Sequence, residues 1–377
     1  MISWNELQFR QDDWLRVHSD TIYWRRSLLN EVTSRDRELF VYALERVRAG
    51  QRALIQNYAP GLGDRLERDS SVATTPHMDR LLQLALKHQP RVKPDPQRWF
   101  DAISLFDQAL ALTQIEKADP VELVGRGIEA LIDLLSDRLF VGGFEPTDFF
   151  VYHDPEHEYL VGPNDVGIGK HLSHRAIGKI RRKTRLMCRR VRDNGLVFLH
   201  HRIKDPFGVW LKMQRRVHNG LDDPFVVPDR CGLMFVVEGR DDVSQLAKRI
   251  TDLLIEKNAV MTEPLAANFS TSGSVDPDNG HSSSQYKVAK MRLRWRGREY
   301  ELQFIAFHDY FNAARSLTGA NHALYKLRQA LDIHFPHLWP VEIYEIDWGN
   351  PHVRHLVSSR KIAQLGWRVE GEHNTSS

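Results

Sequence analysis

The hydrophobic pattern of the chain changes its period near residue 145, and this change limits the folds that the chain can adopt. Before that point apolar residues recur at spacings of three and four, as on one side of an amphipathic helix. The clearest examples are segments 101–115 and 121–139, with Pro120 placed where a helix can begin. Beyond residue 145, β-prone and continuous apolar runs take over. We therefore predict an α+β chain, with a helical N-terminal domain followed by a mixed-sheet domain.

Within the second part, strands and helices are expected to alternate. A hairpin is predicted at 149–161, and further strands at 196–200, 231–237, 286–295, 298–307 and 341–346. The helices expected between them cover 209–217, 241–257 and 308–332, and a helix at 78–87 is expected in the first part. The polar segment 268–285 is rich in Ser, Gly and Asp, so it is expected to form a flexible lid that orders when an acceptor binds.

Composition excludes several classes of protein. The 377 residues give room for two domains, and no run of about 18 apolar residues is present to cross a membrane. The N-terminus has no apolar core behind a basic start, so a cytoplasmic protein without a secretory signal is expected. Two cysteines, Cys188 and Cys231, are too few for a disulfide scaffold or a cysteine zinc cluster.

Charge is unevenly distributed, although the net charge is only +3. Segment 175–192 holds nine basic residues and no acid, and we predict that it forms a basic helix. Such a block needs anions nearby, which could be nucleotide phosphates, nucleic acid or acids elsewhere in the fold. A solvated helix face is the simpler alternative. The nine residues are Arg175, Lys179, Arg181, Arg182, Lys183, Arg185, Arg189, Arg190 and Arg192.

Two acids occupy positions where acids are unusual. Asp229 directly precedes the apolar run 231–237, and Glu301 lies inside an apolar strand, with Gln303 on the same face by the period of two. A carboxylate within apolar β-structure needs a partner, and two such acids brought together are typical of a Mg²⁺ site. We predict that Asp229 and Glu301 lie on neighbouring strands and face one cleft. Taken singly, each acid is also compatible with a strand-end cap or an exposed edge position.

A cluster of cations precedes these acids. Arg202 and Lys204 lie on a strand, and Lys212 follows on a helix that begins after Pro206. A rigid strand-to-helix corner of this kind can direct three cations at a polyphosphate. We predict that the three cations line the same cleft as the acids.

The two clusters, in this order and spacing, resemble the synthetase domain of the RelA/SpoT family of nucleotide pyrophosphokinases over about residues 195–330. The resemblance implies a nucleotidyltransferase-like domain at 195–377. It leaves a helical accessory domain at 1–144 and a connector of hairpin and basic helix at 145–194. The matching residues are Arg202, Lys204, Lys212, Met213, Asp229, Gly232, Tyr286, Lys287, Glu301, Leu302, Gln303, His322, Tyr325 and Lys326.

The resemblance also implies an enzyme that transfers pyrophosphate from ATP to the 3′-hydroxyl of a guanine nucleotide, as in (p)ppGpp synthesis during the stringent response. Asp229 and Glu301 would be the catalytic residues and would hold Mg²⁺, while Glu301 helps to deprotonate the acceptor. Arg202, Lys204 and Lys212 would bind the ATP phosphates, and Tyr286 would stack on the acceptor base. Gln303, His322 and Lys326 are further candidate site residues.

Several positions depart from the family pattern. Gly208 stands in place of the usual serine, and Met234 and Ile305 stand in place of arginines. Segment 287–290 reads Lys-Val-Ala-Lys where a serine and a histidine are usual. Each change removes a phosphate or ribose contact, so the acceptor or the activity itself can differ from the family's.

Two alternatives to alarmone synthesis therefore stay open. One is a toxin that pyrophosphorylates the 3′ end of tRNA, with the basic segment 175–192 contacting RNA. The other is a non-catalytic fold that senses nucleotide or RNA. The His-Asp pairs at 153–154 and 308–309 lie outside the helical half and lack further ligands, so we predict neither a hydrolase nor a Mn²⁺ site. The sequence leaves the oligomeric state open.

Overall fold

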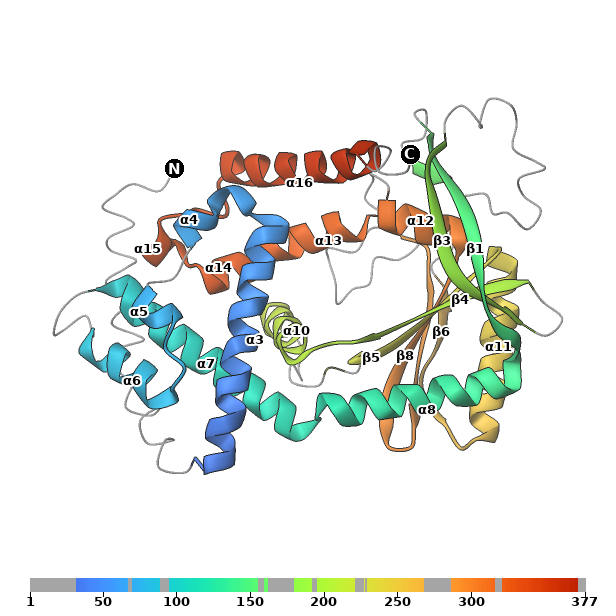
Figure 1. The fold of residues 1–377 in the computed structure, drawn as a ribbon, viewed down its shortest axis with the longest axis horizontal. Helices are drawn as coiled ribbons and strands as arrows, with labels where there is room; N and C mark the ends of the chain where they lie inside the picture. The colour runs from blue at the N-terminus through green and yellow to red at the C-terminus, as the bar shows by residue number, and fades with distance from the viewer. Residues whose placement is uncertain are drawn as a thin grey trace. The chain divides into compact units, whose positions relative to one another are not determined.

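The computed structural model describes residues 32–66, 70–88, 95–154, 159–161, 180–191, 195–220, 227, 229–267, 286–315 and 321–371. The chain forms two compact units, each assembled from separate stretches of sequence (Figure 1). The helical unit comprises residues 1–121, 205–225 and 327–360, and the sheet unit comprises 122–204, 226–326 and 361–377. None of the helices in these described ranges combines the length and apolar content that a membrane span requires.

Long helices with defined N-caps form the first part of the helical unit. At the start of α3, the Thr33 hydroxyl accepts a hydrogen bond from the Asp36 backbone at 3.2 Å and the Asp36 carboxylate accepts one from the Thr33 backbone at 3.1 Å. At the start of α7, Asp95 accepts from the backbone N–H of Arg98 at 3.0 Å. The elements are α3 (Ser34–Tyr58), η2 (Pro60–Leu62), α4 (Gly63–Leu66), α5 (Ser70–Ala73), α6 (Met78–Lys87) and α7 (Pro96–Ala118).

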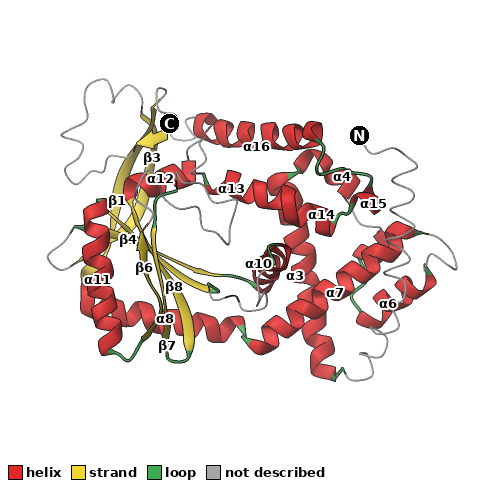
Figure 2. Cartoon of the chain, turned by 180° about the vertical axis from the view of Figure 1, so that it is seen from behind, coloured by secondary structure: helices red, strands yellow, loops and turns green. Residues whose placement is uncertain are grey.

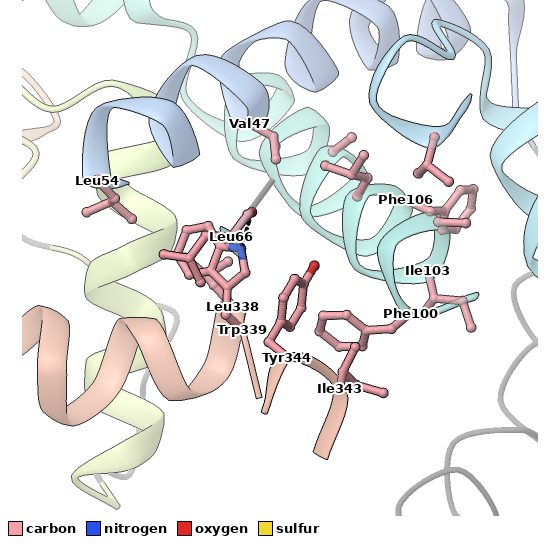
Figure 3. Packing of buried hydrophobic residues seen from close by; sticks show 14 of the residues in the cluster. Val47, Leu54, Leu66, Phe100, Ile103, Phe106, Leu338, Trp339, Ile343 and Tyr344 are labelled. Carbon is pink, nitrogen blue, oxygen red and sulfur yellow. Dashed lines mark hydrogen bonds between the residues drawn. The ribbon is translucent and has the colours of Figure 1, made fainter. Parts of the chain in front are cut away.

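Later parts of the chain complete the core of this unit. Phe207 and Trp210 of α10 (Pro206–His218) are buried among the N-terminal helices. The segment after α13 contributes Trp339 and Tyr344 to this core (Figure 3). The indole N–H of Trp339 donates to the Leu66 carbonyl at 3.1 Å. The ring of Tyr344 lies edge-on to that of Phe100, with 6.2 Å between the ring centroids. Its elements are η4 (Ala330–His334), α14 (Phe335–Leu338), α15 (Val341–Tyr344) and the first part of α16 (Pro351–Gly371).

The sheet unit is built on an eight-stranded mixed sheet, ordered β2-β1-β3-β4-β5-β8-β7-β6 (Figure 2). Among the described strands, only β5 and β8 run parallel, and the chain between them passes through α11, β6 and β7. The β1–β3 ribbon extends well beyond its short pairing with β4 (Figure 1). The strands are β1 (Phe140–Asp154), β2 (Tyr159–Val161), β3 (Ile180–Val191), β4 (Leu196–Ile203), β5 (Cys231–Val237), β6 (Val260–Ala267), β7 (Ala289–Trp295) and β8 (Arg298–Ala306).

The two faces of the sheet carry different layers. One face packs on α8 (Val121–Leu139) and α11 (Arg240–Glu256), and odd-numbered β5 residues such as Leu233 and Phe235 enter this core. The opposite face packs on Phe307 and Phe311 of α12 (Phe307–Arg315), and Val236 of β5 enters that smaller core. Because side chains alternate along a strand, this division assigns a face to every strand residue.

The α+β class, the helical N-terminal region and most predicted elements are confirmed, but three predictions are wrong. Residues 180–191 of the predicted basic helix form strand β3, because they pair along β1. Residues 341–344 of the predicted last strand are helix α15, whose Ile343 and Tyr344 are buried in the helical core. The predicted helix 308–332 is instead composed of α12, α13 (His322–Gln329) and the π-helical η4.

The boundaries of the two units also differ from the predicted domains 1–144, 145–194 and 195–377. Helix α8 belongs to the sheet unit because its apolar stripe, which includes Ile128 and Leu135, is buried in the sheet core. Segments 205–225 and 327–360 belong to the helical unit for the corresponding reason, since their aromatic residues fill its core.

Candidate active site on one face of the sheet

The register of four strands places three of the predicted site residues, Arg202, Glu301 and Gln303, on one face of the sheet, together with Gly232 and Lys290. Arg202 of β4 lies opposite Gly232 of β5, and Gly232 lies beside Glu301 of the parallel strand β8. One step along, Lys290 of β7 lies opposite Gln303 of β8. All five belong to the face covered by α12, because their strand neighbours of opposite parity enter the other core. We call these five residues the site face.

Gly232 leaves an open position in the middle of the site face. A Cβ built on Gly232 would meet only backbone oxygens, that of Glu301 at 3.8 Å and that of Arg202 at 4.0 Å. No described side chain therefore lies within 4 Å of this point. Glycine in a strand interior commonly marks a place where a ligand approaches the backbone closely.

Glu301 is the most unusual group of the site face. Its residue is only 5% exposed, and its Oε2 accepts a hydrogen bond of 2.6 Å from Nε2 of Gln303. No cation among the described residues lies within ion-pair distance of Glu301, because Arg292, its partner in register on β7, pairs with Glu263 of β6 instead. A buried carboxylate held by a single neutral amide is poorly compensated by the described residues, and a ligand cation would compensate it.

Asp229 is compensated by a cation from its own unit. It precedes β5 by two residues and is 7% exposed. The Lys204 ammonium contacts the Asp229 carboxylate and also donates to the Asp229 carbonyl at 3.0 Å. The backbone of Lys204 donates to the Arg230 carbonyl at 3.0 Å, which continues the β4–β5 pairing toward this pair. The structure therefore places a cation directly on the predicted metal-binding aspartate.

Tyr286 and helix α13 contribute the remaining polar groups near the site face. Burial raises the pKa of Tyr286 well above its usual range, and the nearby negative charge of Glu301 raises it further. Desolvation, together with the positive charges of Lys326, Arg202 and Lys290, lowers the pKa of His322 to about 4. The ring centroids of His322 and Tyr325 lie 5.5 Å apart. His322 is therefore neutral near pH 7.

Two apolar residues lie next to the site face on the same side of the sheet. Met234 and Ile305, which stand where the resembling family has arginines, both pack into the core under α12. Ile305 is fully buried, and Met234 lies opposite His200 of β4. The two arginines of the family pattern are thus replaced by core residues on this face.

Two further predictions about the site, the place of Lys212 and the lid, are not tested by this arrangement. Lys212 lies on α10 of the helical unit, so its predicted place beside Arg202 and Lys204 stays a prediction. The predicted lid at 268–285 lies outside the described residues. His308 and Asp309 lie in the first turn of α12, as expected for a helix start, and the Asp309 carboxylate accepts two hydrogen bonds from Arg240 at 2.7 and 2.8 Å.

Three arginines of the predicted basic helix have partners within the sheet unit. Arg185 makes two hydrogen bonds to Asp148, its partner in register on β1, at 2.7 and 3.0 Å. Arg190 lies 3.6 Å from Glu145 of the same strand. Arg189 stacks over two phenylalanine rings of β1 and donates to the Ser136 hydroxyl of α8 at 2.6 Å. Acids and aromatic rings of the fold therefore account for these three arginines, while the side chains of residues 181–183 and all of residues 175–179 and 192 lie outside what the structure describes.

The donor chemistry of Asp229 and Glu301 fits a magnesium ion. Mg²⁺ prefers oxygen ligands and is usually bound by one or two carboxylates plus substrate phosphates. Within the described ranges no group of three or more His, Cys, Asp or Glu side chains is gathered to hold a metal by itself. A metal bound here would therefore depend on phosphate oxygens from a substrate.

Comparison with known proteins gives no further assignment, since no protein-family model, curated protein or solved structure matches this chain.

Proposed function

We propose that the sheet unit is a nucleotidyltransferase-like, ATP-dependent pyrophosphokinase whose reaction takes place on the site face. The observation that carries this proposal is the state of Glu301, a 5% exposed carboxylate without a cation partner among the described residues. It lies beside the open position at Gly232, where a substrate can reach the backbone. Poorly compensated charges of this kind are typical of groups that act on a ligand.

In the proposed reaction, the ribose 3′-oxygen of an acceptor nucleotide attacks the β-phosphorus of ATP. The bond from that phosphorus to the oxygen shared with the α-phosphorus breaks, so AMP leaves and the β- and γ-phosphates stay on the acceptor. Glu301 accepts the proton of the hydroxyl. Arg202 and Lys204 bind the ATP phosphates and offset their charge, which is the main contribution of protein groups to phosphoryl-type transfers.

Asp229 and Glu301 would hold Mg²⁺, which when bound offsets the negative charge of the β- and γ-phosphates. The Lys204 ammonium already rests on Asp229 and can turn toward a phosphate when a divalent ion takes its place. Tyr286 would supply the ring on which the acceptor base stacks. We favour a free guanine nucleotide over tRNA as acceptor, because Arg185 and Arg190 of β3 are engaged with acids of β1.

The direct test is incubation of the protein with γ-labelled ATP, Mg²⁺ and either GDP or bulk tRNA. We expect label on GDP. Glu301→Gln should lower the rate by at least about 100-fold, the usual contribution of a general base. Glu129→Gln, the same change at an exposed position of α8, is the matched control and should keep full activity.

Gly232→Val supplies a second, independent variant. Its side chain would enter the open position without meeting any described side chain near its Cβ, so we expect the protein to fold and the transfer to be lost. If tRNA became labelled and GDP did not, the acceptor would be tRNA and not a free guanine nucleotide. Absence of label with either acceptor would favour the non-catalytic sensor over an enzyme.

A further inference from the structure

Strand β4 has one edge that no described strand completes. It pairs with β5 in regular register from Val197 to Ile203, but it pairs with β3 only through residues 196–198. On the β3 side, the backbone of residues 199–203 therefore has no strand partner within the described part of the sheet. An open edge of this kind is a template for another extended segment.

Strand β3 leaves a second open edge on the side that faces β4. It pairs with β1 along its length, but its pairing with β4 begins only at Cys188, so none of the described strands pairs with residues 180–187 on that side. The β1–β3 ribbon thus departs from the sheet, while β4 continues along β5 (Figure 1). Two open backbone edges therefore diverge from the pair formed by Cys188 and Phe198.

Strand β6, at one end of the sheet, shows what a protected edge is like. It contains Pro264, and its register with β7 shifts twice within 8 residues. Proline and irregular register hinder the pairing of an edge strand with another chain. Segment 199–203 of β4 contains no proline, and its register with β5 is unbroken. The β4 edge therefore lacks the features that protect β6.

The side chains along the β4 edge alternate in character. His200 and Arg202 are exposed and lie on the side of the sheet that bears the site face. Leu199 and Ile203 lie on the other side, where they are only partly buried against the core under α8 and α11. A strand added at this edge would have the same period of two, so one of its faces would meet a cation and the other would meet apolar side chains.

The charge of the neighbouring ribbon favours a negatively charged partner. Strand β3 carries six Lys and Arg residues and no acid, whereas β1, which pairs with it, carries three acids. Two of these acids, Asp148 and Glu145, pair with arginines of β3. Positive charge is therefore in excess on the ribbon, and it would attract an anionic segment that lay beside β4.

We propose that the open edge of β4 binds an extended peptide segment in which acidic and apolar residues alternate. The backbone of the segment would pair with residues 199–203, its acids would meet Arg202, and its apolar side chains would cover Leu199 and Ile203. A nucleic acid fits this edge less well, because its sugar-phosphate backbone has no N–H groups to pair with strand carbonyls. The inference does not rest on the proposed function, since this binding involves neither ATP nor an acceptor nucleotide.

The test is fluorescence anisotropy of a labelled peptide of alternating Glu and Val residues, titrated with the full chain. We expect saturable binding, and binding weaker by roughly 10-fold for a peptide of the same composition with Glu and Val in two blocks. Arg202→Glu should weaken binding of the alternating peptide by roughly 10- to 100-fold, because it replaces an attractive contact with a repulsive one. Lys248→Glu, the same change of charge at an exposed position of α11, is the matched control and should bind within about twofold of wild type.

Two N-methylated forms of the alternating peptide test the backbone pairing with the protein unchanged. N-methyl groups on every second residue block one edge of an added strand, so at least one of the two forms should lose binding. Equal binding of the alternating, block and N-methylated peptides would indicate charge attraction alone and would overturn the proposal. Absence of peptide binding would also overturn it, and binding of an oligouridine in that case would assign the edge to nucleic acid instead.

Discussion

Individual charged residues of the sheet unit differ in whether the fold itself supplies their partner. Lys204 and Asp229 satisfy one another with side chains only 14% and 9% exposed, whereas Glu301, Arg202 and Lys290 have no ion-pair partner among the described residues. A charge that is buried without a partner raises the free energy of the folded state, so the 5% exposed Glu301 costs stability unless a ligand binds it. The residues without partners thus identify the site more sharply than the paired ones.

Lys204→Met should destabilise the protein by about 3 kcal/mol, because it leaves the Asp229 carboxylate buried without its cation. The loss can be measured by urea unfolding, with Lys248→Met at an exposed position as control. Adding Asp229→Leu to Lys204→Met should recover part of the stability, since both charges are then removed. A Lys204→Met protein as stable as the control would contradict a buried pair.

His322 should titrate near pH 4, and NMR of the histidine rings can follow this titration. The His322→Asn variant lacks the signal of this ring and so identifies it. Its folded-state pKa is below the ordinary value, so between pH 6.5 and 4 the unfolded chain binds more protons than the folded chain. The contribution of His322 to stability is therefore complete above pH 6.5 and is lost as the pH falls to 4. Lys290→Gln should raise this pKa, because it removes one of the cations. A titration midpoint of His322 near pH 6.5 in both the wild-type protein and Lys290→Gln would contradict the presence of cations near this ring.

Sequence reasoning located Glu301 and Gln303 together because the period of two in a strand is a local rule. It identified Lys290 only as a departure from a family pattern. The significance of that lysine depends on which strand lies beside β7 and on where Glu263 and Arg292 pair. Such non-local register cannot be derived from composition or spacing within one strand.

At the scale of elements, the basic segment shows how a local pattern can indicate the wrong structure. Lys and Arg residues are good helix formers, and nine of them without an acid predict a solvated helix. In the structure the acids come from β1, so Arg185 meets Asp148 and Arg190 meets Glu145 across two antiparallel strands. Cross-strand pairing of opposite charges stabilises a ribbon that no single-segment pattern reveals.

The hairpin between β7 and β8 was predicted correctly because its turn has a local cause. Arg296 and Gly297 both have positive φ, 50° and 77°, as a two-residue turn of type I′ requires. Gly297→Ala should destabilise the protein by about 1 kcal/mol, since an L-residue is strained there although nothing lies within 4 Å of the new Cβ. Gly143→Ala, also in open space but without positive φ, is the matched control and should cost less. Equal unfolding midpoints for the two variants would argue against the turn type.

At the scale of the whole molecule, the chain crosses between its two units several times. The change of periodicity near residue 145 predicted the α+β class, but it did not reveal that helical segments after residue 200 return to the first unit. Amphipathic helices show which residues are buried and do not show against which neighbour. Helix α10 was therefore assigned to the predicted nucleotidyltransferase domain, although Phe207 and Trp210 fill the helical core.

The helical unit should consequently fail to fold when it is cut at the boundary that the sequence suggests. A fragment of residues 1–144 lacks Phe207, Trp210, Phe335, Trp339 and Trp348, all of which are 5% exposed or less in the complete chain. Without them the fragment would expose the apolar faces of α3 and α7, and the indole N–H of Trp339 could not meet the Leu66 carbonyl. We expect the fragment to keep helical far-UV circular dichroism but to lack a near-UV signal and a cooperative thermal transition. In the complete chain, Trp339→Ala should lower the free energy of unfolding by about 3–5 kcal/mol, as expected for the loss of a buried tryptophan. Cooperative unfolding of the isolated fragment would show instead that residues 1–144 form an independent domain and that the later segments only add to it.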